Sequence, residues 1–122
     1  WFVPGSAVNE LRREALEQME EKLLPNFKGG EKNLGMRMFD DGACKIMRGR
    51  LEPGASIGLH THEGNSEIIY ILEGSGKVEY DAGVETLAAG DCHYCPEHHT
   101  HRLINDSSED LTFFAVVPQH HL

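Results

Sequence analysis

Two histidines and a glutamate lie close together near the middle of the chain, in the segment GLHTHEGNSEIIYILEG (residues 58–74). His60 and His62 are separated by one residue, so on a strand both side chains project from one face and could bind the same ion. Glu67 follows the turn-rich tetrapeptide EGNS, which would let the chain reverse and return the Glu67 carboxylate to that point. One hairpin would then supply three metal ligands. The alternative is that His60 and His62 are ordinary surface histidines.

The elements that must position these residues are short strands. From Met36 onward, turn signals such as Asp-Asp-Gly, Pro-Gly and Gly-Asp separate β-like blocks, which are MRMF, CKIMRGRL, IGLHTH, SEIIYIL, GKVEY, VETLAAG, CHYC, THRLIN and LTFFAVV. Roughly eight strands on such short connections predict an all-β barrel or jelly roll.

The N-terminal part of the chain has a different pattern. In NELRREALEQMEEKLL (residues 9–24), apolar residues recur four apart behind Asn9, which can cap a helix, and Pro25 follows directly. This pattern predicts one amphipathic helix over Asn9–Leu24. The composition changes at FKGGEKN (residues 27–33), so we expect a helical extension over residues 1–33 and a β-barrel domain over residues 34–122.

The composition limits the expected partners and location. At 122 residues and 13.6 kDa the chain fits one domain. Its formal net charge of −9 would repel nucleic-acid phosphates and anionic membranes, so neither is an expected partner. The sequence shows no apolar run of about 18 residues and no signal-peptide pattern, so we expect a cytoplasmic location. Its three cysteines are too few for a secreted disulfide framework, which favours reduced thiols.

A second histidine-rich segment, GDCHYCPEHHTHRLIN (residues 90–105), makes a resemblance to a known family specific. The chain resembles the cupin family, whose first motif is Gly, five residues, His-x-His, three or four residues, Glu, six residues, Gly. The second motif is Gly, five residues, Pro-x-Gly, two residues, His, three residues, Asn. The positions that match are Gly54, His60, His62, Glu67, Gly74, Gly90, Pro96, His101 and Asn105. The chain departs from the motifs at His98, which stands where the family has glycine, so a turn there could place a histidine at positive φ.

The resemblance implies a cupin double-stranded β-barrel (jelly roll) in which His60, His62, Glu67 and His101 bind one divalent transition metal. Three imidazoles and one carboxylate suit Fe, Mn, Ni, Co, Cu or Zn better than Mg or Ca, which prefer all-oxygen shells. Four protein ligands would complete a tetrahedral zinc site, whereas five- or six-coordinate Fe(II), Mn(II) or Ni(II) would keep positions for O₂ or a chelating substrate. The family also implies a homodimer.

Three functions are compatible with the sequence, because one fold can host different chemistries. The first is a metal-dependent enzyme acting on a small organic substrate, most simply an oxidoreductase of the dioxygenase type. The second is a non-redox isomerase or lyase in which the metal acts as a Lewis acid. The third is a protein that binds or senses a small molecule without turning it over. We favour an enzyme, because a sensor usually carries an output domain and none is evident in this sequence.

Strand alternation predicts which other residues face the barrel interior. Those expected to face inward with the ligands are Ile69, Ile71, His99 and Leu103, and His99 is preferred over His93 and His98 as a pocket residue. On the strand CKIMRGRL, either Arg48 and Arg50 face inward, or Lys45, Met47, Gly49 and Leu51 do. Cys92 and Cys95 should lie on opposite faces of their strand as structural thiols, although their spacing also occurs in redox and zinc motifs.

Overall fold

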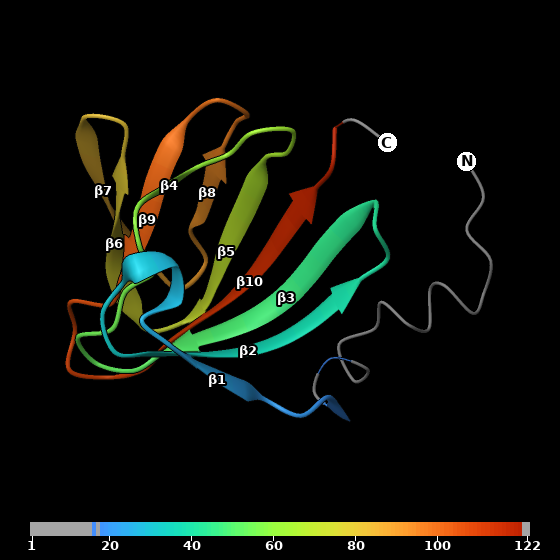
Figure 1. Ribbon diagram of the computed structural model, residues 1–122. Coiled ribbons are helices and arrows are strands. Elements are labelled where there is room, and N and C mark those ends of the chain that lie inside the picture. The colour runs from blue at the N-terminus through green and yellow to red at the C-terminus, as the bar shows by residue number, and fades with distance from the viewer. Residues whose placement is uncertain (1–15, 17, 121–122) are drawn as a thin grey trace.

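The computed structural model describes residue 16 and residues 18–120, and nearly all of the regular structure in this part of the chain is β (Figure 1). One 3₁₀ turn, η1 (Phe27–Gly29), follows the first strand. The strands are β1 (Lys22–Pro25), β2 (Asn33–Asp40), β3 (Cys44–Leu51), β4 (His60–Thr61), β5 (Glu67–Glu73), β6 (Ser75–Tyr80), β7 (Gly83–Ala88), β8 (Cys92–Cys95), β9 (Thr100–Ile104) and β10 (Leu111–Pro118). Every β-like block found in the sequence overlaps one of the strands β2 to β10, which confirms the all-β prediction.

The strands form two facing antiparallel sheets (Figure 1). One sheet has the order β1-β2-β3-β10-β5-β8, and the other has the order β4-β9-β6-β7. The chain crosses repeatedly from one sheet to the other, which is the jelly-roll arrangement. One crossing, from β5 to β6, takes place at Gly74, where φ is +87° and an added Cβ would lie 2.4 Å from the Asp110 carbonyl oxygen. The motif glycine at this position is therefore required by the corner between the sheets.

Alternation along the strands places one face of each sheet in the core. On β5, Glu67, Ile69 and Ile71 are buried, whereas Ile68 and Tyr70 are exposed. The buried cluster between the sheets consists mainly of aliphatic side chains together with Phe113. Glu67 therefore belongs to an inward-facing row that is otherwise apolar.

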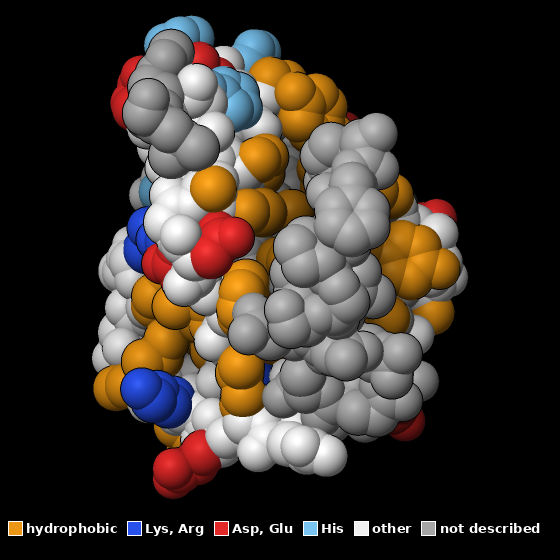
Figure 2. Space-filling view, turned by 90° about the vertical axis from the view of Figure 1, so that its right-hand side faces the viewer, with side chains coloured by type: hydrophobic (Ala, Val, Ile, Leu, Met, Phe, Trp, Pro, Cys, Tyr) orange, Lys and Arg blue, Asp and Glu red, His pale blue; other side chains and the backbone are white. Residues whose placement is uncertain are grey.

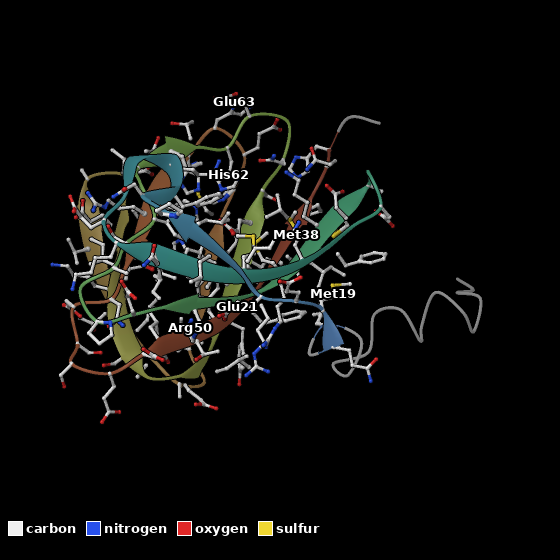
Figure 3. The ribbon with its side chains drawn as sticks, turned by 60° about the horizontal axis from the view of Figure 1, so that its bottom comes forward. Met19, Glu21, Met38, Arg50, His62 and Glu63 are labelled. Carbon is white, nitrogen blue, oxygen red and sulfur yellow. The ribbon has the colours of Figure 1, made fainter. Side chains whose placement is uncertain are left out.

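The orientation of β3 decides between the two alternatives left open by the sequence. Gly49 faces the core, because the ring of Phe113 occupies the space that its Cβ would need, with Cζ only 2.2 Å away. Met47 and Leu51 are buried on the same side. Arg50 projects from the other face, where its Nη2 donates to Glu21 Oε1 at 2.8 Å (Figure 3). Inward-facing arginines on β3 are therefore excluded.

The expected helix over Asn9–Leu24 needs a correction at its end. Lys22–Pro25 form strand β1, which pairs with β2 at the edge of the larger sheet. Pairing with a sheet edge has overridden the helical pattern of these last residues. Residues 1–15 and 17 of the expected extension lie outside the described part of the chain. In the part that is described, no helix is long and apolar enough to cross a membrane.

Candidate metal centre

Both sheets contribute to the group of side chains that the sequence singled out. His60 on β4 is paired with His101 on β9, both in the smaller sheet. His62 follows β4, and Glu67 is the first residue of β5 in the larger sheet. The turn over EGNS connects the two sheets at this point. The chain thus returns Glu67 to the histidines as predicted, but the expectation of one hairpin is wrong, because β5 belongs to the facing sheet and does not pair with β4.

The donor atoms of these four residues converge on one point. His101 Nε2 lies 3.0 Å from His62 Nε2, 3.0 Å from His60 Nε2 and 2.9 Å from Glu67 Oε1. Glu67 Oε1 also lies 3.3 Å from His62 Nε2 and 3.9 Å from His60 Nε2. All four residues offer a ligand atom within 4.8 Å of the others, so the group could hold a metal ion.

Hydrogen bonds at the opposite ring nitrogens fix the orientation of the imidazoles. His60 Nδ1 donates to the Gly58 carbonyl oxygen at 2.8 Å, and His62 Nδ1 donates to Asn65 Oδ1 at 2.6 Å. Since an oxygen acceptor requires a proton on Nδ1, the neutral form of each ring keeps a lone pair on Nε2. Both lone pairs point into the group.

The third histidine, His101, is also oriented by a hydrogen bond at its Nδ1, and the partner is the imidazole of His93. His93 Nδ1 lies 3.0 Å from Glu85 Oε1, and His93 Nε2 lies 3.0 Å from His101 Nδ1. The carboxylate accepts the proton of His93 Nδ1, so His93 Nε2 is an acceptor and His101 Nδ1 must donate to it. His101 Nε2 is then left with its lone pair.

The electrostatics of the group favour a cation at its centre. Burial opposes the ionisation of Glu67, but the Nε2 atoms of His101, His60 and His62, which attract its carboxylate whenever one of these rings is protonated, outweigh burial and hold the pKa of Glu67 well below the ordinary value. Burial lowers the pKa of His101, which favours its neutral form despite the opposing effect of Glu67. A carboxylate and three imidazole lone pairs facing one another repel unless a cation lies between them. The donor set therefore fits a divalent transition metal.

His93 is the residue that the sequence prediction missed. Its side chain is only 1% exposed, and it packs beside His101 with 5.2 Å between the ring centroids. His99, which we expected in the pocket, is instead 43% exposed and bonds Asp81 Oδ2 through Nδ1 at 2.7 Å. The expectation for His99 is wrong because this residue precedes β9 and is not subject to strand alternation. His98 adopts φ +73°, as expected for the position where the family has glycine.

We expect His93→Leu to weaken metal binding by about 10- to 100-fold, because the change removes the acceptor for His101 Nδ1 while nearly preserving volume. Glu85→Gln should produce a smaller loss in the same direction, since an amide is a weaker acceptor for His93 Nδ1–H. Competition with a chromophoric chelator measures both affinities, and His99→Ala is the matched control. An unchanged affinity in a folded His93→Leu protein would contradict this role.

A second group that could hold a metal is made of His93, Cys95 and His101. Burial raises the pKa of the Cys95 thiol to about 12, so the thiol stays protonated near neutral pH. The facing nitrogens of His93 and His101 are already bonded to each other. This group is therefore a poor metal site. Cys92 is exposed and Cys95 is buried, which confirms that they lie on opposite faces of β8.

A cavity of about 400 Å³ opens beside His60, His62 and Glu67. Its other polar lining residues are Lys28, Lys45, Thr61, Glu63 and Asn65. Its apolar lining residues are Leu24, Phe27, Met36, Met38, Met47, Ile57, Phe113 and Val117. Figure 3 labels Met38 on β2 and the neighbouring residues His62 and Glu63 after β4, all of which line this space. A largely apolar chamber with a few convergent polar groups is typical of a site for a small organic molecule.

Comparison with known proteins agrees with this geometry. The cupin domain profile matches residues 47–117. A Thermotoga maritima protein named "Oxalate-binding protein" is 36% identical over 101 residues, which are 77% of this chain and 83% of that protein. A crystal structure from Thermotoga maritima, described as a "predicted oxalate decarboxylase", aligns with a TM-score of 0.81 and 30% identity over 85% of this chain and 96% of that chain.

More distant structures share the fold alone. An RmlC-like cupin from Shewanella frigidimarina aligns with a TM-score of 0.71 and 21% identity over 86% of this chain and 87% of that one. The profile covers more than half of the chain, and the Thermotoga maritima protein is similar along most of its own length. With its two-sheet jelly roll and its His/Glu group, this chain belongs to the cupin family.

Proposed function

We propose that the protein binds one divalent transition metal through His60, His62, Glu67 and His101, and that it binds a small carboxylate beside the metal. The observation that carries this proposal is the convergence of three Nε2 lone pairs and one carboxylate at the edge of a cavity. A six-coordinate metal in this place would offer two further positions to the oxygens of a chelating acid. The name of the Thermotoga maritima relative supports a carboxylate as the ligand class.

The charges around the cavity also favour an anion. Three neutral imidazoles and the Glu67 carboxylate would leave a divalent ion with one positive charge in excess. Of the other charged residues that line the cavity, Lys28 and Lys45 are basic and Glu63 is acidic. The loaded chamber is therefore positive, although the chain carries a formal net charge of −9.

Calorimetric titration with oxalate tests this proposal. We expect oxalate to bind the Mn(II)- or Co(II)-loaded protein and to bind the metal-free protein at least about tenfold more weakly, because the metal supplies two of its contacts. Glu63→Gln, which lies in the lining but outside the converging group, should keep the metal dependence. Equal binding with and without metal would contradict the proposal.

Turnover of the bound acid is a second candidate, with O₂ as co-substrate or without redox change. It is favoured by the four-donor set, since a six-coordinate ion would keep positions for exogenous ligands. Oxygen uptake and product analysis with the metal-loaded protein test it. If none of the supplied acids is converted, turnover is contradicted and the protein only binds its ligand.

The homodimer implied by the family remains a proposal. Strand β1 lies at the edge of the larger sheet, where two copies could meet.

A further inference from the structure

We infer that the ligand is larger than oxalate: a 2-oxo or 2-hydroxy monocarboxylate whose head chelates the metal and whose apolar arm lies against Met36, Met38 and Met47. This inference rests on the function proposed above and specifies the class of acid. It follows from the size of the cavity, the chemistry of its far wall and the distance between that wall and the converging donors.

The cavity is much larger than oxalate requires. Its volume is about 400 Å³. A water molecule takes up about 30 Å³ of liquid, and oxalate, with six non-hydrogen atoms, displaces only a few of them. Most of the chamber would stay filled with water beside apolar side chains if oxalate were the physiological ligand. Apolar wall that stays in contact with water contributes nothing to binding.

Three methionines make up the part of the wall that an arm would reach. Met36 and Met38 lie on β2 and Met47 lies on β3, and Met38 pairs directly with Met47. Met36 and Met47 are each 8% exposed and Met38 is 42% exposed, so the wall runs from the interior to the opening. Figure 2 shows hydrophobic side chains gathered below a group of histidines on the face that it presents. Methionine is flexible and polarisable, which suits a wall that packs against an aliphatic chain.

The arm must cross a known number of strands to reach this wall. The strand order places β10 and β3 between β2 and β5, which carries Glu67. Neighbouring strands lie about 4.8 Å apart, so β5 is on the order of 14 Å from β2, which carries Met36 and Met38, and about 10 Å from β3, which carries Met47. Long side chains on both sides shorten the gap, but an acid without an arm cannot contact both the metal and the methionines. A chain of several carbon atoms can do so.

The test compares the affinities of a homologous series for the Co(II)-loaded full chain. Oxalate, pyruvate, 2-oxobutanoate, 2-oxohexanoate and 2-oxooctanoate are titrated, and the change in the metal spectrum gives each Kd. We expect the affinity to rise about three- to fourfold for each added methylene until the wall is covered. Met38→Gln should reduce this gain per methylene, since the half-exposed position accepts an amide without loss of folding. Val84→Gln is the matched control, because Val84 is an exposed apolar strand residue outside the cavity lining.

The outcomes separate this inference from the proposed function. If no acid changes the metal spectrum, the proposed function fails. If oxalate and pyruvate bind but affinity does not increase along the series, the inference is overturned and the proposed function stands. If affinity increases equally in the wild type, Met38→Gln and Val84→Gln, the arm does not lie on the methionine wall, and the placement is wrong.

Discussion

Replacing His60 and His62 together by alanine should reduce the bound metal from about one ion per chain to less than about one tenth, because a two-ligand site no longer competes with solvent and buffer. Both residues supply an Nε2 lone pair to the converging group, and each ring is oriented by a hydrogen bond from its Nδ1. His60 is partly buried and His62 is buried, but both lie at the wall of a cavity, so truncation should not prevent folding. Elemental analysis of protein purified without added metal measures the change.

The control for this experiment is His99→Ala. His99 is close to His101 in the sequence but lies at the surface, bonded to Asp81. The His99→Ala protein should therefore retain the metal content of the wild type. Equal metal in the wild type and in the double variant would show that the ion binds elsewhere, and the assignment of the site would be wrong.

Gly58→Ala should lower the free energy of unfolding by more than about 3 kcal/mol, because the new Cβ meets backbone that cannot move aside. An ideal Cβ at Gly58 would lie 1.7 Å from the Lys28 carbonyl oxygen and 2.9 Å from the Gly30 amide nitrogen. Gly58 also donates its own amide to Phe27 O at 2.9 Å, which fixes the η1 turn against the segment before β4. Relief of the clash would displace the Gly58 carbonyl that orients His60, so the fraction that folds should also bind metal more weakly.

Urea unfolding of the metal-free protein measures the stability, and Gly83→Ala is the control. At Gly83 the nearest atom to an added Cβ is the Tyr80 carbonyl oxygen at 3.7 Å. That substitution should change the free energy of unfolding by less than about 1 kcal/mol. If Gly58→Ala and Gly83→Ala were equally stable, the close contact between η1 and the β4 segment would be refuted.

The strands and the converging group were predictable because they depend on local patterns. Period-two alternation and turn residues place β2 to β10 along the chain, and the two motifs name the four side chains that meet. The corner at Gly74 was likewise marked by its residue type, since its backbone conformation favours glycine.

The errors occur where contacts between strands, which the pattern within one segment does not contain, decide the structure. Lys22–Leu24 fit a helical pattern, but the open edge of β2 is available to them only in the folded sheet. On β8, alternation alone allows either His93 or its neighbours to face inward. The choice is made by contacts with His101 and Glu85, which belong to strands of the other sheet. The two cysteines of β8 give no signal for this choice, because they lie on opposite faces and only the structure shows that Cys95, on the face of His93, is the buried one.

The orientation of β3 shows the same limit. Side chains on β3 alternate between its two faces whichever face is buried, so the pattern cannot say whether Arg48 and Arg50 or Met47 and Gly49 face the core. The ring of Phe113 fills the space beside Gly49, which shows that Gly49 faces the core. This contact joins strands more than sixty residues apart in the sequence.

The visible spectrum of the Co(II)-loaded protein, recorded before and after addition of a chelating acid, tests the central claim most directly. Cobalt reports both its coordination number and the entry of new ligands. If His60, His62, Glu67 and His101 bind one ion with positions open to a carboxylate, one equivalent of Co(II) will give a weak five- or six-coordinate spectrum that shifts when oxalate or 2-oxohexanoate binds. An intense tetrahedral spectrum that no acid alters, or a failure to bind Co(II), would contradict the account.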